Sequence, residues 1–356
     1  MAREVVGLKI GASRLVAARV ATNGSVELRQ LASEPLPRGI FAAGEVKDPD
    51  ALGQALKSFF KKHKIPKRNV RIGVANNRIG VRTIELQGIA DSRQVANAVR
   101  FRAQEALPIP LEQAVLDFQI LSESQGADGV ERKKVLLVVA YRDLVDGYLE
   151  ACKAAGVKLM GVDLEAFALL RSLLPTPNGA ASAAGVEKAA LVAVSIGSER
   201  SVLAVSDGEI CDFTRVLAWG GASLTGAIAR ALEVDGDEAE RIKRELTLDG
   251  PGWPEGLGPE KTAKAREAIQ IGLQTFGREL VSSLQFYQSQ EGSLGIREVV
   301  LAGGAAQLPG LAAAVQQMTG VAVRVGDPVA SVKVGKKVKG DPGPDAAVPI
   351  GLGMGV

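Results

Sequence analysis

The sequence contains few of the residue types that proteins use most often for redox, metal and acid–base chemistry. Its 356 residues include two cysteines, Cys152 and Cys211, and a single histidine, His63. Two isolated cysteines are too few for a disulfide framework or a thiolate metal site, so we expect both to be small core residues. His63 lies among lysines at the polar end of an expected helix. We expect it to be solvated rather than part of a catalytic triad.

The sequence also lacks a long hydrophobic run and a strong charge of either sign. Its most apolar stretches, residues 135–141 and 189–196, are strand-length, and a membrane-spanning helix needs roughly 20 apolar residues. The N-terminus runs directly into a strand pattern at residues 5–10, without the basic and apolar segments of a secretory signal, so we expect a cytoplasmic protein. A formal net charge of +3 gives no reason to expect nucleic acid as a partner.

An internal repeat is the most informative feature that is present. The sequence VGLKIGAS at residues 6–13 has a counterpart, VAVSIGSE, at residues 192–199. In each copy alternating apolar residues lead to a glycine, Gly11 or Gly197, and then to a second apolar run, which predicts a β-hairpin. Two such hairpins indicate two related halves. A cleft between the halves is a natural anion site, because both turns could direct backbone N–H groups into it.

Between and after the hairpins, helical and strand patterns alternate. Asp48 is placed to cap, and Pro49 to open, a helix that extends to residue 64, and a helix from Asp91 or Ser92 ends before Pro108. Strands are expected at residues 70–75, 81–86, 115–121, 134–141 and 298–302, and further helices at 224–232, 237–246, 261–290 and 311–318. Residues 175–186, rich in Ala, Gly, Ser and Pro, are the expected linker.

Further motifs follow in a definite order. They are VRTIEL at 81–86, Arg100–Phe101 with Glu105, PIPL at 108–111, VLDFQ at 115–119, VDLE at 162–165, Ala239–Glu240 with Lys243, SLQFYQSQ at 283–290, and AGG at 302–304 followed by PGL at 309–311. Together with the two hairpins, these motifs resemble the PilM family, relatives of FtsA and actin, across nearly the whole chain.

The resemblance implies an α/β, actin-like fold, in which a ribonuclease H-like unit is duplicated and a small α+β subdomain is inserted. On this basis residues 1–81 form the first half, 82–165 the inserted peptide-groove subdomain, 166–186 the return and linker, 187–330 the second half, and 331–356 a C-terminal hairpin loop and a final helix that returns to the first half. It also implies ATP or ADP in the cleft, and a groove beside the insertion that binds the N-terminal cytoplasmic tail of the membrane protein PilN.

The cleft departs from the family pattern at two positions. Lys9 and Ser195 stand where the two hairpins should each carry an aspartate, and magnesium loses its main protein anchors without those carboxylates, so magnesium binding is doubtful. Lys9 could act as a counter-charge for metal-independent nucleotide binding, or it could pair with Glu199 across an empty cleft. Glu199 would repel a phosphate, and Arg200 would partly offset that repulsion.

Candidate binding residues follow from the resemblance. Those for ATP are Lys9, Gly11, Ser13, Gly197 and Ser198 on the phosphate side, and Glu240, Lys243, Gly303 and Gly304 on the adenosine side. Glu240 and Lys243 could instead be only a surface ion pair. Those for the peptide groove are Arg100, Phe101, Ile109 and Leu111, of which Phe101 or Ile109 could equally be core. We expect no metal site and no catalytic residue.

The resulting hypothesis is a non-catalytic, or at most weakly catalytic, scaffold at the cytoplasmic side of the inner membrane. It would join the type IV pilus assembly platform by binding a PilN-like tail and other platform proteins. Two alternatives remain: an active actin-like ATPase that drives or gates pilus assembly, and an FtsA-like filament. The sequence leaves open whether the chain forms a homo-oligomer. The basic residues Lys333, Lys336, Lys337 and Lys339 are expected in a solvated hairpin loop, or against anionic lipid heads.

Overall fold

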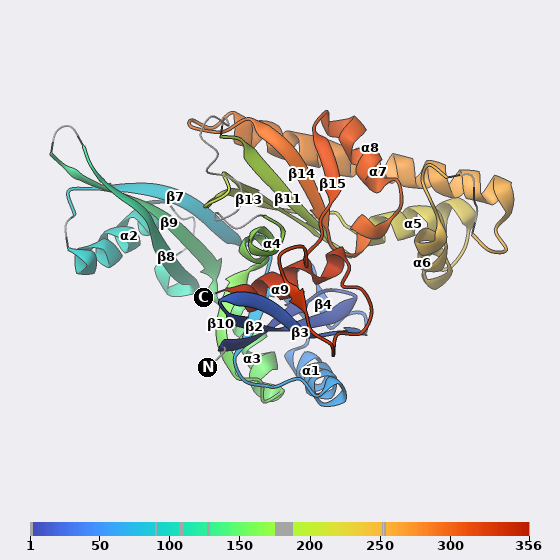
Figure 1. The fold of residues 1–356 in the computed structure, drawn as a ribbon, viewed down its shortest axis with the longest axis horizontal. Helices are drawn as coiled ribbons and strands as arrows, with labels where there is room; N and C mark the ends of the chain where they lie inside the picture. The colour runs from blue at the N-terminus through green and yellow to red at the C-terminus, as the bar shows by residue number, and fades with distance from the viewer. Residues whose placement is uncertain are drawn as a thin grey trace.

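A computed structural model describes residues 3–89, 91–106, 110–126, 129–174, 188–250, 252 and 254–355. The expected linker at 175–186 and the groove candidate Ile109 lie outside the described residues. Figure 1 shows two large sheets, one above the other, with a third, smaller sheet projecting to the left. The N- and C-terminal ends of the drawn chain lie close together beside the lower sheet.

The first sheet has six strands in the order β10-β6-β1-β2-β3-β16. Their bounds are β1 Arg3–Ile10, β2 Arg14–Asn23, β3 Ser25–Pro35, β6 Val70–Val74, β10 Leu159–Leu164 and β16 Lys333–Val334. Strands β1, β2 and β3 form an antiparallel meander, and β6 and β10 extend the sheet in parallel on the other side of β1. The expected hairpin at residues 6–20 is therefore confirmed.

The second sheet repeats this order. It runs β13-β12-β11-β14-β15, with β11 Ala190–Ile196, β12 Ser201–Ser206, β13 Cys211–Leu217, β14 Ile296–Ala302 and β15 Ala322–Val325. Again the first three strands along the chain are antiparallel and the last two are parallel additions beside β11. The chain is thus built from two copies of one strand topology, as the sequence repeat predicts.

Helices cover the outer face of each sheet. On the first sheet these are α1 Pro49–His63 and α3 Arg142–Ala154, and on the second α7 Gly258–Gln288 and α8 Leu311–Thr319. Beyond the strands of the second sheet, α5 Gly221–Leu232 packs on α7, and α6 Gly236–Glu245 packs on α5. Helix α1 begins as expected, because the Asp48 side chain accepts a hydrogen bond from the Ala51 amide and Pro49 occupies the first turn. Its apolar face, Leu52, Leu56, Phe59 and Phe60, is buried in the core.

Two further helices, α4 Glu165–Leu173 and α9 Ala347–Met354, lie between the sheets. Helix α9 contacts β1 and β2 and packs on α4, which in turn contacts β11 and β12. Seven residues of α9, Ala347 to Gly353, are buried, as expected for a helix enclosed on every side. This layer joins the two halves into one body with a continuous apolar centre.

The inserted unit is a three-stranded sheet of its own, in the order β7-β9-β8. It comprises β7 Ile79–Gln87, α2 Ser92–Ala106, the 3-10 turn η1 Leu111–Gln113, β8 Ala114–Gln125 and β9 Glu131–Tyr141. Helix α2 covers one face through Val95, Val99 and Ala103. The expected insertion of 82–165 also contains α3 and β10, but β10 pairs with β6 and α3 packs on α1, so both belong with the first sheet.

Several local expectations can be compared with the structure. Cys152 and Cys211 are buried, as predicted, and burial raises the pKa of each thiol to about 12. His63 is partly exposed, with 24% of its side chain accessible, and its Nε2 lies 2.8 Å from Oε1 of Glu34. The four lysines at 333, 336, 337 and 339 are exposed, as expected, but Lys333 lies in β16, which pairs in parallel with β3 and not in a hairpin. Among the described residues no helix is long and apolar enough to cross a membrane.

Candidate functional site

The turns of the two hairpins, β1–β2 and β11–β12, face each other across a small pocket of about 50 Å³. Its lining includes Lys9, Gly11, Ala12, Phe41, Gly44, Tyr148, Glu165, Ser195, Gly197, Ser198, Glu199 and Arg200. The topology accounts for this meeting point. In each sheet the carboxyl end of the first strand reaches the same edge as the carboxyl ends of its parallel neighbours, where sites form in α/β sheets.

Lys9 does not pair with Glu199, so that prediction is wrong. Its Nζ lies 3.1 Å from Oε2 of Glu165, and the two side chains are only 16% and 8% exposed. Glu165 opens α4 directly after β10, which brings its carboxylate to the end of the sheet near Lys9. The Oε2 atom of Glu199 instead accepts a hydrogen bond of 2.8 Å from the Ala43 amide. The charge of Lys9 is therefore already balanced within the protein.

The residues at the hairpin turns do not fit a magnesium ion. The two carboxylates that line the pocket are Glu165 and Glu199, and each already has a donor, Lys9 or the Ala43 amide. Magnesium is held through carboxylates and phosphates in a near-octahedral shell, and a lysine ammonium in the pocket opposes it. No group of three or more His, Cys, Asp or Glu side chains converges anywhere in the described ranges.

The turn amides contribute less than the sequence predicts. The Gly11 amide donates to the carbonyl oxygen of Arg14, and the Gly197 amide donates to that of Arg200, so both N–H groups are used inside their own turns. Ser13 is exposed and does not line the pocket. Gly11, Gly197 and Ser198 do line it. Of the phosphate-side candidates, the structure brings together all except Ser13.

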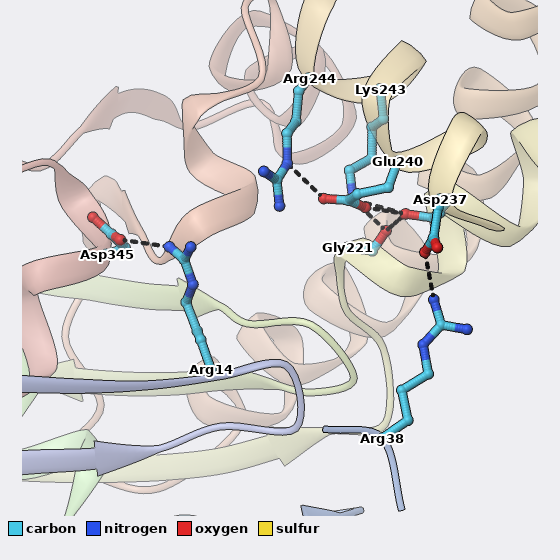
Figure 2. A network of polar contacts seen from close by, with 9 residues as sticks. Arg14, Arg38, Gly221, Asp237, Glu240, Lys243, Arg244 and Asp345 are labelled. Carbon is cyan, nitrogen blue, oxygen red and sulfur yellow. Dashed lines mark hydrogen bonds and ion pairs between the residues drawn. The ribbon is translucent and has the colours of Figure 1, made fainter. Parts of the chain in front are cut away.

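On the adenosine side, Glu240 and Lys243 form a closed network rather than a surface ion pair. Nζ of Lys243 donates to Oε2 of Glu240 at 2.6 Å, to Oγ1 of Thr225 at 2.8 Å and to the Gly221 carbonyl at 3.1 Å. The Lys243 side chain is 12% exposed. Figure 2 shows Arg244 approaching the same carboxylate from the other side. This network fastens α6 to α5 at the margin of the cleft.

The electrostatics of Glu240 reflect this network. Burial alone would raise the pKa of the Glu240 carboxyl, but hydrogen bonds from Lys243, Thr225 and Arg244 together lower that pKa below its ordinary value. Glu240 is therefore held as a carboxylate with both oxygens occupied. Oε1 accepts from Arg244 alone, so its second lone pair could accept a hydrogen bond from a ribose hydroxyl.

The two glycines Gly303 and Gly304 have different roles: the first allows a close backbone contact, and the second lies beside open space. Gly303 has a φ of +84°, its amide donates to the Pro344 carbonyl, and a Cβ there would collide with the Ile196 carbonyl. It is needed for the close passage of the chain past the end of β11. Gly304 has no atom within 4 Å of the place where its Cβ would lie, so the open space beside it can admit a ligand.

A larger pocket of about 300 Å³ lies at the base of the inserted sheet. Its lining comes from three units: the end of the first sheet and α4, the start of β7, and the strands β12 and β13 of the second sheet. These residues are Val74, Ala75, Asn76, Asn77, Ile79, Val81, Leu164, Ala166, Val202, Thr214, Arg215 and Val216. Strand β7 is at the edge of its sheet, β13 is at the edge of another, and the two strands contact each other.

Of the groove candidates chosen from the sequence, the three described ones, Arg100, Phe101 and Leu111, do not line this larger pocket. Arg100 and Phe101 lie on the exposed side of α2, where Phe101 is 63% exposed, so Phe101 is not core. Leu111 is half-buried and packs against the core under α2. The structure thus places Arg100 and Phe101 on the surface of α2, and Leu111 in a turn next to the start of α3, where Arg142 donates to the carbonyl oxygens of Glu112 and Ala114.

Sequence reasoning missed Glu165 as the partner of Lys9 and missed the lining of the larger pocket. The signal for Glu165 was available, because it follows a predicted parallel strand at its carboxyl end, where side chains from neighbouring strands converge. The lining residues Thr214 and Val216 carry no local signal. They lie on an edge strand, and a single sequence does not show which strand will be an edge.

Two hairpin-led halves of identical strand order, with a cleft at their turns, define an actin-like α/β protein. The solved structure of MreB5 of Spiroplasma citri bound to AMPPNP has the same fold, with a TM-score of 0.58 and 11% identity over 99% of this chain and 95% of that one. The family model described as type IV pilus assembly protein PilM matches residues 7–342, and the chain belongs to that family.

Two relatives give the degree of similarity within and beyond the family. The solved PilM-PilN type IV pilus biogenesis complex matches with a TM-score of 0.80 and 29% identity, over 99% of this chain and 98% of that chain. Cell division protein FtsA of Bacillus subtilis (strain 168) is 24% identical over 322 residues, which are 80% of this chain and 70% of FtsA. The predicted fold class and family are therefore confirmed.

Proposed function

We propose that this chain is a scaffold of a type IV pilus assembly platform, and that it captures the N-terminal cytoplasmic tail of a PilN-like membrane protein. The proposal is supported by membership of the PilM family and by the likeness to a PilM-PilN complex along almost the entire chain. A tail bound in this way would hold the protein at the cytoplasmic side of the inner membrane through its partner, where the other platform proteins would meet it.

The observation that carries the proposal is the pocket of about 300 Å³ at the base of the inserted sheet. It lies between two strand edges, β7 and β13, that contact each other but belong to different sheets. An extended peptide can add to such an edge through its main chain, while pockets accept alternate side chains. Ile79, Val81 and Val216 offer apolar surface there, and Asn77 and Thr214 offer hydrogen-bonding groups.

We further infer that the cleft does not run a magnesium-dependent ATPase cycle. Lys9 and Ser195 stand at the ends of β1 and β11, and the carboxylates nearby are already engaged. Nucleotide binding remains part of the proposal, with Gly304, Gly197 and Ser198 as the residues beside open space. In this scheme a nucleotide bound in the cleft stabilises the scaffold or changes its conformation, and the cleft does not hydrolyse the nucleotide.

A titration of the whole chain with a synthetic PilN N-terminal peptide tests the scaffold proposal. Calorimetry should show binding that falls by about tenfold in Val216→Arg, because the new side chain fills the pocket and adds an unpaired charge. Phe101→Ala is the matched control on α2, where we expect no change. Thermal unfolding of both variants would establish that they are folded.

Three outcomes would each contradict a different part of the proposal. Absence of peptide binding to the unaltered chain would remove the scaffold function. Loss of binding in Phe101→Ala with retention in Val216→Arg would move the groove to the exposed side of α2. Rapid ATP turnover that requires magnesium would restore the ATPase alternative and end the argument from Lys9 and Ser195.

A further inference from the structure

The positive charge of the chain is concentrated in its first half. Residues 1–81 contain 15 Lys and Arg residues against 6 Asp and Glu residues, whereas the whole chain contains 43 against 40. The rest of the chain is therefore acidic, and the small net charge of +3 conceals a strongly basic part. Such a charge difference between parts of a chain indicates an anionic partner, for example a nucleic acid or a membrane surface.

Much of this excess lies in one stretch without an acidic residue. Between residues 57 and 71 seven side chains are Lys or Arg, and none is Asp or Glu. Lys57 and Lys61 lie one turn apart on α1, and Lys64 is the C-cap of that helix. All three are exposed, and so is Arg68 in the loop that follows.

A second basic segment lies against the first. Helix α3 packs on α1, and the Lys158 amide, after α3, donates to the Lys67 carbonyl, after α1, at 2.6 Å. Nζ of Lys67 donates in return to the Ala155 carbonyl at 2.8 Å. The exposed bases that these contacts bring together, called here the basic face, are Lys57, Lys61, Lys64, Arg68, Lys153 and Lys158.

The charges of the basic face are not neutralised within the described part of the protein. None of its six side chains pairs with a carboxylate there. The neighbouring Lys62 differs, since its Nζ lies 2.6 Å from Oε1 of Glu34. A helix C-terminus favours basic residues through its dipole, which accounts for Lys61 but not for Arg68 and Lys158 in the loops. The unbalanced charge therefore indicates a partner outside the chain.

Exposed apolar side chains beside the basic face favour a lipid surface over a nucleic acid. Leu149, one turn before Lys153 on α3, is 42% exposed, and Met160, two residues after Lys158 on the edge strand β10, is 38% exposed. Apolar side chains next to lysines can enter the boundary between lipid headgroups and acyl chains. Proteins that bind single-stranded nucleic acid instead stack the bases on aromatic side chains, and the exposed phenylalanines of the described chain lie elsewhere, on α2 and α7.

We propose that the basic face docks on the anionic headgroups of a lipid bilayer. Clusters of about four to eight Lys and Arg residues are typical of proteins that bind anionic lipid. Helices α1 and α3 lie side by side on the face of the first sheet that is turned away from the second half (Figure 1). Neither pocket described above includes a residue of the basic face, so docking leaves both open. Such a contact is distinct from the proposed function, in which the chain reaches the membrane through PilN.

Flotation of the whole chain with lipid vesicles, without any PilN peptide, tests the proposal. The chain should bind vesicles made of equal amounts of phosphatidylglycerol and phosphatidylcholine, and it should not bind vesicles of phosphatidylcholine alone. Binding should weaken steeply as the salt rises from about 0.1 M to about 1 M, because the Debye length falls from about 10 Å to about 3 Å. The triple variant Lys61→Ala, Lys64→Ala, Arg68→Ala should bind about a hundredfold more weakly, which is about fivefold for each base removed.

The matched control removes three exposed bases from the second half, as Arg230→Ala, Lys261→Ala, Arg297→Ala. Both triple variants have the same net charge, so the control should stay within about twofold of the unaltered chain if the position of the charges decides binding. Thermal unfolding establishes that both are folded. The basic-face variant should still bind the PilN peptide as the unaltered chain does, which separates failure of this proposal from failure of the scaffold function.

Four results would overturn the proposal. They are no binding to the anionic vesicles, an equal loss of binding in the two triple variants, tighter binding to double-stranded DNA than to the vesicles, and a loss confined to another lysine cluster. The variant Lys336→Ala, Lys337→Ala, Lys339→Ala tests the last of these. If it loses vesicle binding while the basic-face variant retains it, the lipid contact lies in the segment after β16.

Discussion

At the scale of single residues, Lys9 and Glu165 form a buried ion pair whose members depend on each other. Their side chains are 16% and 8% exposed, so either one alone would be a charge left in the interior. Removal of one member of such a pair costs more than the pair contributes as a whole, because desolvation of the remaining charge is no longer compensated.

We therefore predict that Lys9→Ala lowers the free energy of unfolding by about 3 kcal/mol, and that the double variant Lys9→Met, Glu165→Leu recovers most of this loss. Urea unfolding measures both. Arg38→Ala is the control, since the Arg38 and Asp237 side chains are 86% and 97% exposed and should contribute less than about 1 kcal/mol. An unchanged unfolding midpoint in Lys9→Ala would mean that Glu165 reaches water or another donor.

At the scale of elements, the layer between the two sheets depends on close approach of helices α4 and α9. A Cβ on Gly351 would collide with the backbone of Ala168, including its carbonyl oxygen. Helix backbones can approach this closely only where a residue has no side chain. The position of a Cβ is fixed by its own backbone, and the atoms that it would meet are backbone atoms of Ala168. No side-chain rotation can therefore relieve the collision.

Gly351→Ala should accordingly lower the free energy of unfolding by about 3 kcal/mol, or force α9 away from α4. Denaturant unfolding gives the energy, and near-ultraviolet circular dichroism reports loss of packing. Gly295→Ala serves as the control, since nothing lies within 4 Å of its Cβ position. Equal stability of the two variants would show that α9 and α4 can move apart at little cost in free energy, contrary to this prediction.

The same scale shows what the sequence could predict. Local signals placed the elements within a few residues: the helix expected at 261–290 is α7, Gly258–Gln288, and the one expected at 311–318 is α8, Leu311–Thr319. The repeat predicted both hairpins and thus the location of the cleft. Hydrophobic period, capping residues and turn glycines carry that information within one segment of chain.

Pairings between distant segments were less predictable. Lys9 meets Glu165 rather than Glu199 because β10 brings α4 to the end of the first sheet, and that depends on strand order. Similarly, the choice of groove residues on α2 followed the family resemblance, whereas the pocket forms where β7 meets an edge of the second sheet. No local pattern encodes which edges will face each other.

At the scale of the whole molecule, a few polar contacts cross the cleft between the halves. The Glu199 carboxylate, from the second half, accepts a hydrogen bond from the Ala43 amide, from the first. Arg38 and Asp237 form the exposed pair that Figure 2 shows at the margin. Because the exposed pair is weak in water, the Glu199 contact is the better candidate for holding the hairpin turns together.

We predict that Glu199→Ala speeds hydrogen exchange of the Ala43–Gly44 turn, without changing the global free energy of unfolding by more than about 1 kcal/mol. Exchange followed by mass spectrometry measures the turn directly. Asp237→Ala provides the comparison and should leave the turn protected as before. If neither variant changes exchange there, Tyr148 and Asn76, which donate to the Gly44 carbonyl, hold the turn by themselves.

Helix α9 has a consequence for how the protein is made. It is the last helix of the described chain, and its apolar side chains fill the layer between the first sheet, which begins with β1, and helix α4. On a ribosome, five strands of the first sheet, β1 to β3, β6 and β10, would therefore emerge long before the helix that covers their inner face. Domains normally fold as they emerge, but the first half can bury its inner face only once α9 has been made. We expect the nascent first half to depend on chaperones until α9 leaves the ribosome.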